Sequence, residues 1–417
     1  MKRYLMSLVA ICLFATYSLP ASKAKKEKPA KLSTLVKAAH LAIKNSNGQD
    51  GAKNNLLAAI PRTDISEKDR ANIHYECALL DESKNGVENR KAYLKQPYDT
   101  ATFFNTLLSM YSHLRLCDSI DALPNSQGNI RLKYSSKTKA LRQKHKRNIL
   151  NGGKFFLSKG QYDVAYNYMD DYYTYSGMPT SDSVMCKVSY WATLCAFMSQ
   201  KHDRTLKYID KAITSSDNSL QPILQEYKVR TYMTLGDAQE VKHELRIGVD
   251  KYPSHDFFFV NLIDMLYNER NFQEGIQLAD SLISLDASKA IYWYSKSKLE
   301  MAENNYEKCI EYSDSTIARD GSFVDAYHNK GISYLNLALI MKESACFDMK
   351  DPKCVSDRKK IQDLYQKAKP CIEKVRELQP EAIERWGNPL YRIYMNLNLG
   401  KEFEEIDKLL NQKSVSQ

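Results

Sequence analysis

The sequence predicts an all-α protein built from antiparallel helix pairs that repeat along the chain, because three observations agree. At steps of 34 residues from position 191 to position 327, four of the five residues are bulky aromatics. Only 15 glycines and 12 prolines occur among 417 residues, which leaves little material for the turns of a β-rich fold. The chain is also too long for one ordinary compact core, whereas an extended array of helix pairs has no such limit.

The amino end has the features of a cleaved secretory signal over residues 1–24. Lys2 and Arg3 precede an apolar run, and small residues follow it. The run is shorter than the roughly 20 residues that a membrane-spanning helix needs. We therefore predict an exported protein, periplasmic or secreted, with a basic linker at 25–31 and no transmembrane segment in the mature chain.

Residues 32–122 contain helix-like stretches without a clean 34-residue period, such as LSTLVKAAHLAIKN. We predict about three divergent helix pairs here, which either cap the array or extend it. Residues 123–136 (LPNSQGNIRLKYSS) combine Pro, Asn, Gly and Ser, which indicates a linker. The array itself is predicted over residues 137–412, and residues 413–417 are expected to form a disordered tail.

The 34-residue period is the strongest pattern in the sequence. The positions that it connects are Trp191, Gln225, Phe259, Trp293, Tyr327 and, after an insertion, Trp386. Apolar residues follow most of them on the same helix face, and small residues such as Cys309 recur in a second helix. We expect the aromatic residues to fill gaps beside these small residues, so Cys195 and Cys309 are predicted to be packing residues.

In these positions the sequence resembles the tetratricopeptide repeat family, whose 34-residue helix–turn–helix unit carries a W-x2-L-G-x2-Y, A, F and P signature. The resemblance covers roughly residues 146–412, and it is to exported bacterial members of the family. It implies a right-handed superhelical solenoid of antiparallel helix pairs. In this family the first helices line a concave groove, in which a protein or peptide partner is held.

The resemblance also implies which side chains face that groove. Carried over by register, they are Glu226, Arg230, Met233, Val260, Asp264, Tyr267, Tyr294, Lys298, Met301, His328, Leu335, Tyr391 and Tyr394. The set is mixed in charge and rich in Tyr and Met, which suits adaptable apolar contacts with a few polar anchors. The same residues equally suit an ordinary amphipathic helix face. The clamp with which some members hold two carboxylates is not supported, because Asn is missing from its key positions.

An insertion at about residues 343–363 interrupts the sixth repeat. Once Cys12 leaves with the signal, eight of nine cysteines remain, and an even number in an oxidising compartment favours disulfides. Cys346 and Cys354 are the best candidate pair, because they bracket a Pro-containing loop. Two interpretations stay open: a solvated loop with a lengthened helix, and a partner-specific flap held by the disulfide.

The formal net charge of +10 is concentrated locally, since residues 131–147 contain eight Lys or Arg and no acid. This segment indicates either a solvated helix face or a binder of an anionic surface, such as lipid headgroups or glycans. We expect no nucleic-acid partner, because the rest of the chain is not basic.

Catalytic signatures are absent from the sequence. It has no G-x-S-x-G motif, its histidines are scattered, and NGGKF at 151–155 lacks the first Gly and the Ser or Thr of a phosphate loop. We predict a protein that is not an enzyme and has no cofactor or metal. The leading hypothesis is an envelope or secreted scaffold that holds a protein or peptide partner in its groove. The alternative is a lipid- or glycan-surface binder that acts through residues 131–147.

Overall fold

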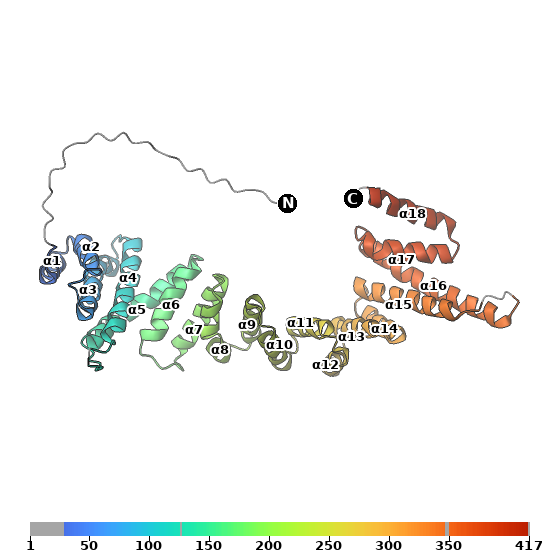
Figure 1. The fold of residues 1–417 in the computed structure, drawn as a ribbon, viewed down its shortest axis with the longest axis horizontal. Coiled ribbons are helices and arrows are strands. Elements are labelled where there is room, and N and C mark those ends of the chain that lie inside the picture. Colours follow the sequence, from blue (N-terminus) through green and yellow to red (C-terminus); the bar gives the residue numbers. More distant parts are fainter. Residues whose placement is uncertain (1–28, 126, 347–349, 416–417) are drawn as a thin grey trace, which may run out of the picture. The chain divides into compact units, whose positions relative to one another are not determined.

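The regular structure of the described chain is entirely helical. The computed structural model describes residues 29–125, 127–346 and 350–415, and side chains as far as residue 411. Eighteen helices in these residues form nine pairs, and each helix packs against the next one within α1 to α6 and within α7 to α18 (Figure 1). This confirms the predicted all-α repeat fold. The predicted signal at 1–24 and most of the linker at 25–31 lie outside the described residues.

We call the odd-numbered member of each pair the first helix and the even-numbered member the second helix. The pairs are α1 (Leu32–Asn45) and α2 (Gln49–Ala59); α3 (Glu67–Tyr93) and α4 (Thr100–Asp121); α5 (Ser135–Ser158) and α6 (Tyr162–Tyr175); α7 (Ser183–Met198) and α8 (His202–Ser215); α9 (Gln221–Leu235) and α10 (Ala238–Lys251); α11 (Asp256–Asn268) and α12 (Phe272–Leu285); α13 (Ala290–Ala302) and α14 (Tyr306–Arg319); α15 (Val324–Ser344) and α16 (Pro352–Leu378); and α17 (Ile383–Asn396) and α18 (Gly400–Val415).

The chain divides into two compact units between Gly177 and Met178, so α1 to α6 form the first unit and α7 to α18 the second. The segment 123–136, predicted as a linker, connects α4 to α5 inside the first unit, and α5 already begins at Ser135. Helices on its two sides pack together: the Tyr168 hydroxyl of α6 donates a 2.6 Å hydrogen bond to the Phe104 carbonyl of α4. The pairs in residues 32–122 therefore share one compact unit with α5 and α6.

The turn between first and second helices repeats with the same period as the sequence. Gly236, Arg270 and Asn304 follow one another at 34-residue intervals, and all three have a left-handed backbone, with φ of 76°, 57° and 62°. This conformation ends the first helix and lets the next residues start the second one. It is easy for Gly and tolerated by Asn, whereas Arg270 adopts it at some cost. The repeat is therefore a property of the backbone as well as of the side chains.

Small residues in both helices of the repeat receive large side chains, as the sequence predicts. A Cβ atom added to Gly248 of α10 would lie 2.3 Å from the Phe258 ring of α11. A Cβ atom added to Gly331 of α15 would lie 2.4 Å from the Ile372 side chain of α16. Cys195 and Cys309 are fully buried, which confirms their predicted packing role.

The expectation that the recurring aromatic position is always in the core is wrong for Trp293. Trp386 is 4% exposed, but Trp293 is only partly buried, and its neighbour Tyr292 fills the core instead. The indole Nε1 of Trp293 donates to the Ala287 carbonyl (3.0 Å), and the Arg319 guanidinium lies 4.3 Å from the ring centroid. The buried face of α13 is unusually polar, so the tryptophan lies at its edge.

Part of the polarity of the buried face of α13 comes from an ion pair between Lys and Asp, which is repeated in α15. The Lys296 ammonium reaches back to Asp280 of α12 (2.6 Å), and the Lys330 ammonium reaches back to Asp314 of α14 (2.5 Å). These lysines occupy the position where the family signature has Leu. Their ion pairs join a first helix to the second helix of the preceding pair, which replaces an apolar contact at this point of the repeat.

The carboxyl end differs from its prediction. Helix α18 continues to Val415, so the expected disordered tail at 413–417 is wrong for residues 413–415, and the last two residues lie outside the described chain. None of the described helices is long and apolar enough to cross a membrane.

Candidate functional site

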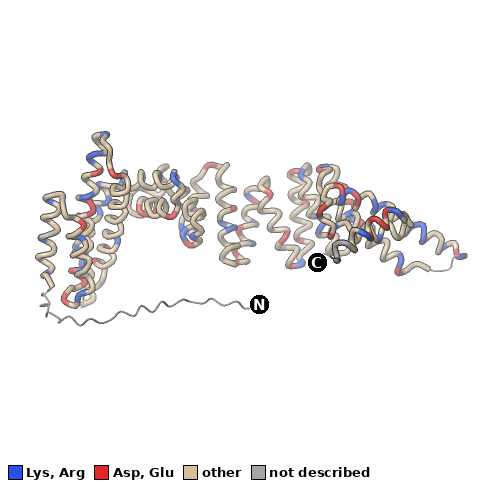
Figure 2. Tube along the Cα trace, turned by 90° about the horizontal axis from the view of Figure 1, so that it is seen from above, with Lys and Arg blue, Asp and Glu red and all other residues tan. Residues whose placement is uncertain are grey.

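The predicted groove residues belong to the first helices of the second unit. We use the name first-helix face for the side chains at 226, 230, 233, 260, 264, 267, 294, 298, 301 and 328, which lie on α9, α11, α13 and α15. Consecutive first helices contact one another from α11 to α17, in addition to their contacts with the second helices. Lys and Arg are interspersed with Asp and Glu along the trace of this unit (Figure 2). The face itself carries acids such as Asp264 and bases such as Lys298, so it has no single sign of charge.

The centre of the face is a cluster of Asp264, Tyr267 and Lys298. The Lys298 ammonium lies 2.7 Å from the Asp264 carboxylate and 4.7 Å from the centroid of the Tyr267 ring. Tyr267 and Asp264 belong to α11 and Lys298 to α13, so the cluster joins two repeats. Tyr267 is among the exposed large side chains of the protein. The cluster thus offers an accessible aromatic ring beside an exposed ion pair.

A second cluster lies around Glu226. Its carboxylate accepts from Arg230 Nε (2.7 Å) and faces His255 Nε2 (2.8 Å). Glu226 therefore contacts both Arg230 of its own helix α9 and His255, which directly precedes α11. The Arg230 guanidinium also lies 4.6 Å from the Phe257 ring. Half of the Arg230 side chain is exposed, which leaves a cation on an aromatic ring at the surface.

A third group connects α13, α15 and α17. The Tyr294 ring packs on Phe323 with centroids 4.8 Å apart, and burial raises the pKa of its hydroxyl to about 12. Arg385 at the start of α17 pairs with Asp325 of α15. Burial and the charge of Arg385 lower the pKa of His328, which favours a neutral imidazole at neutral pH. The group therefore presents a phenol and an imidazole, both uncharged, beside one ion pair.

Asp325, Arg385 and Phe257 take part in these clusters, but the sequence analysis did not include them among the groove residues. Asp325 and Phe257 each lie two residues before a recurring aromatic position, Tyr327 and Phe259. On a helix, this offset places a side chain beside the face that the prediction used. The signal was therefore present in the same 34-residue pattern.

Two predicted groove residues are not exposed. Tyr394 is 3% exposed and its hydroxyl donates to the Glu373 carboxylate of α16 (2.9 Å), while Leu335 is fully buried in the core of α15 and α16. Their assignment to an exposed groove is wrong, because both side chains turn into the apolar core that α15, α16, α17 and α18 share. Tyr391 packs on Phe403 of α18, with ring centroids 4.7 Å apart. Met233 is exposed, and Met301 is partly buried.

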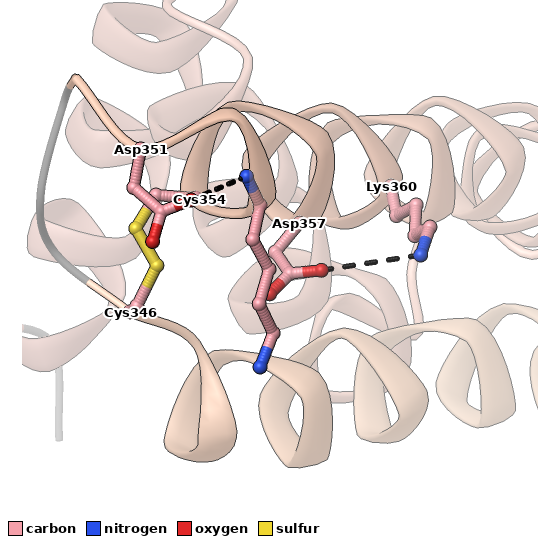
Figure 3. The surroundings of a disulfide bond; sticks show 6 residues. Cys346, Asp351, Cys354, Asp357 and Lys360 are labelled. Carbon is pink, nitrogen blue, oxygen red and sulfur yellow. Dashed lines mark hydrogen bonds and ion pairs between the residues drawn. A yellow bond between two sulfur atoms is a disulfide. The ribbon is translucent and has the colours of Figure 1, made fainter.

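The insertion lengthens both helices of its pair and carries a disulfide. Cys346, directly after α15, is bonded to Cys354 in the first turn of α16, with Cα atoms 5.2 Å apart (Figure 3). An Asp351 oxygen and the two sulfur atoms lie within 4.8 Å of one another. Sulfur atoms joined in a disulfide are not thiolates, so this group is not a metal site in the structure.

The basic segment 131–147 is partly neutralised inside the first unit. Arg142 is buried and pairs with Asp118 (2.5 Å), and Lys144 pairs with Glu82 (2.5 Å). The pKa of Glu82 is lowered to about 2, first by its hydrogen bond with His145 and then by Lys144. Exposed cations remain along the connection to α5 and its first turn; they are Arg131, Lys133, Lys137 and Lys139.

Comparison with known proteins gives matches among solved structures alone. No family model and no curated protein matches the chain. The carboxyl-terminal part of a TPR repeat-containing protein from Cytophaga hutchinsonii is 15% identical, with a TM-score of 0.43, and the match covers 62% of this chain and 93% of that one. A tetratricopeptide repeat protein from Parabacteroides merdae is 14% identical (TM-score 0.35; 64% and 98% covered). A TPR repeats protein from Bacteroides fragilis is 17% identical (TM-score 0.30; 63% and 98% covered).

The geometry of this chain supports a resemblance in fold to the tetratricopeptide repeats. The left-handed turn residues Gly236, Arg270 and Asn304 keep a 34-residue period, and so do the partners Asp264 and Lys298. Paired helices with this period are the defining unit of one helical repeat family. The array therefore resembles the helix pairs of tetratricopeptide repeats in its period and in its turns.

Proposed function

We propose that the protein is a non-catalytic scaffold that binds a protein or peptide segment along the first-helix face. The observation that carries this proposal is the Asp264–Lys298–Tyr267 cluster, which combines an exposed ion pair with an exposed aromatic ring across two repeats. A segment lying across α9, α11 and α13 meets this cluster and also the Arg230 guanidinium on the Phe257 ring. Aromatic and Arg side chains of this kind are the usual anchors of protein interfaces.

The charges of the face favour specificity over raw affinity. Lys298 and Arg230 already have carboxylate partners, so a ligand must offer acids and bases in a matching order to replace these contacts. A partner with one sign of charge leaves half of these groups without compensation. The first-helix face should therefore prefer a segment that carries both signs of charge and has apolar side chains between its charged residues.

The proposal places the protein outside the cytoplasm, in the cell envelope or secreted. The amino end, with Lys2 and Arg3 before an apolar run, supports export. The Cys346–Cys354 disulfide supports an oxidising compartment, because such bonds are rare in a reducing cytosol.

Site-specific photocrosslinking in the native cells tests the proposal. Benzoylphenylalanine replaces Tyr267 on the first-helix face in one variant and the exposed Leu285 at the end of α12 in the control variant. We expect one recurrent protein to be crosslinked from position 267 and not from position 285, as identified by mass spectrometry. Equal crosslinking from both positions contradicts the proposal.

As the alternative, we propose a binder of anionic lipid surfaces that acts through the segment just before α5, within the basic stretch 131–147. Ile130 and Leu132 are exposed large apolar residues, and they alternate with the exposed cations Arg131 and Lys133. Apolar and basic side chains in one short segment suit the interface of an anionic bilayer.

Cosedimentation with phosphatidylglycerol vesicles at 50 and 500 mM salt tests this alternative. Binding that is lost at high salt, and also lost in the Arg131→Gln, Lys133→Gln double variant, supports it. Binding that is equal for the two proteins contradicts it.

A further inference from the structure

A pocket of about 310 Å³ lies in the second unit, where the ends of α15, α16 and α17 meet. Its polar lining consists of Lys342, Arg358, Gln362, Tyr365, Asn396 and Asn398. Ile361, Ala345 and the Cys346–Cys354 disulfide complete the wall. None of these residues belongs to the first-helix face, so the pocket is a separate site.

Tyr365 supplies an unused polar atom in this pocket. The residue is 3% exposed and belongs to the core of α15 to α18, yet it lines the pocket. Its hydroxyl forms no hydrogen bond with any described residue. The hydroxyl is not one of the buried polar atoms that lack a partner, so it is open to water in the pocket and can donate to a ligand there.

The charge of the lining is positive. Lys342 and Arg358 form no ion pair with any described residue, and no carboxylate lines the pocket. Two acids lie nearby on α16 and just before it, but both are engaged (Figure 3). Asp351 accepts from the Lys353 backbone N–H at 2.7 Å, and Asp357 faces Lys360 at 3.9 Å. The pocket therefore offers two exposed cations that have no ion-pair partner among the described residues, and the nearby Asp351 carboxylate is not part of its lining.

The remaining lining fits a small organic body. Gln362 and Asn398 provide amides that both donate and accept hydrogen bonds. Ile361, the Tyr365 ring and the disulfide provide apolar surface beside them. A volume of about 310 Å³ is at the lower end of the range for sites that enclose small molecules.

We infer that this pocket binds an organic carboxylate with a short apolar body. Arg358 and Lys342 receive the carboxylate, the Tyr365 hydroxyl donates to it or to a neighbouring acceptor, and the apolar wall receives the body. A free acid and the last residue of a peptide share this chemistry. The inference does not rest on partner binding at the first-helix face, so either can fail without the other.

Isothermal titration of the full chain with three probes tests the inference. The probes are 4-phenylbutyrate, a free acid; N-acetyl-leucine, which resembles a peptide end; and N-acetyl-leucinamide, which lacks the charge. We expect at least one acid to bind saturably and the amide to bind about tenfold more weakly or not at all. The tighter acid identifies the source of the ligand. Equal binding of acid and amide, or no saturable binding of either acid, overturns the inference.

Three variants connect the binding to the pocket. Arg358→Gln removes one cation, and Tyr365→Phe removes the hydroxyl while keeping the ring in the core. Lys359→Gln is the control, because Lys359 is exposed on α16 next to Arg358 but does not line the pocket. We expect Arg358→Gln to weaken acid binding about tenfold and Tyr365→Phe by a smaller factor, with the control unchanged. If Arg358→Gln and the control bind alike, the site is elsewhere and the inference fails.

Discussion

The Lys298 ammonium lies 2.7 Å from the Asp264 carboxylate, and the two residues are 34 positions apart in the chain. They therefore occupy the same position in consecutive repeats, on α11 and α13. The repeat brings them together because side chains at one position of neighbouring first helices lie next to one another. A pattern that is only a spacing in the sequence becomes a contact on the proposed binding face.

Charge reversal at Lys298 should weaken partner capture without unfolding the protein. Lys298→Glu places a second acid beside Asp264, but both side chains are partly exposed, so the cost in stability is below about 1 kcal/mol. We expect less partner in pull-downs from native cells and an unchanged helical CD spectrum. Lys251→Glu at the end of the second helix α10 is the control and should retain capture.

The exchanged pair, Asp264→Lys with Lys298→Asp, separates a structural role from a binding role. It keeps an ion pair between α11 and α13 but reverses its direction. Capture should stay low in the exchanged protein if a partner recognises these charges. Full recovery of capture would mean that the pair only holds the helices together.

The two tryptophans should differ in their contribution to stability. Trp386→Ala removes a buried side chain and should lower the free energy of unfolding by about 3–5 kcal/mol. Trp293→Ala removes a partly exposed ring that holds one hydrogen bond and one cation–π contact, so we expect about 1–2 kcal/mol. Urea denaturation followed by CD measures both, and equal losses would contradict the observed difference in burial.

Two helical glycines should respond in opposite ways to alanine. Gly331→Ala places a methyl group against Ile372, and overpacking of this kind should cost about 1–3 kcal/mol. Gly86→Ala in α3 meets no atom within 4 Å, so the better helix propensity of alanine should stabilise the protein by about 0.5–1 kcal/mol. Thermal unfolding of the two variants shows whether each substitution raises or lowers the stability of the protein. A stabilised Gly331→Ala protein would show that the helices separate easily at this point.

Loss of the disulfide should destabilise the pair α15–α16. The bond closes a short loop, with a sequence separation of 8 residues, and loop-closure entropy predicts a contribution of about 2–3 kcal/mol. The double variant Cys346→Ser, Cys354→Ser should therefore show faster amide exchange at the start of α16. Reduction of the wild-type protein should have the same effect, whereas unchanged exchange would mean that the lengthened helices hold each other without the bond.

Asp171 should make the first unit less stable as pH rises from about 4 to about 6. Its carboxyl is buried and pairs with Arg115, and burial raises its pKa to about 6 from an ordinary value of 3.8. The folded protein thus holds this proton more tightly than the unfolded chain, and stability present below pH 4 is lost as the proton leaves.

Asp171→Asn, which cannot titrate, serves as the comparison. We expect the stability of the wild type relative to this variant to fall by about 2–3 kcal/mol across that pH range. Urea denaturation of both proteins at pH 4, 5, 6 and 7 measures the difference. A constant difference would show that the carboxyl does not change protonation there.

The sequence predicted most of the repeat and part of the proposed face. The 34-residue pattern placed Asp264, Tyr267 and Lys298 in one set, and the structure brings these three together. The same pattern gave the wrong core residue in α13, because a shift of one position along a helix changes the direction of the side chain. Tyr292 rather than Trp293 fills the core of α13, since neighbouring residues on a helix differ by about 100° in direction.

Local sequence determined the helices, their period and the small residues that admit large neighbours, because these depend on spacing along a single helix or between adjacent ones. Tertiary structure decided what lies far apart in sequence or depends on helix length. Arg385 meets Asp325 across 60 residues, the Tyr394 hydroxyl is bonded to Glu373 of α16, and Tyr365 lines a pocket formed by the ends of three helices. The 34-residue period does not encode these contacts, because each joins residues that are separated by a different number of positions.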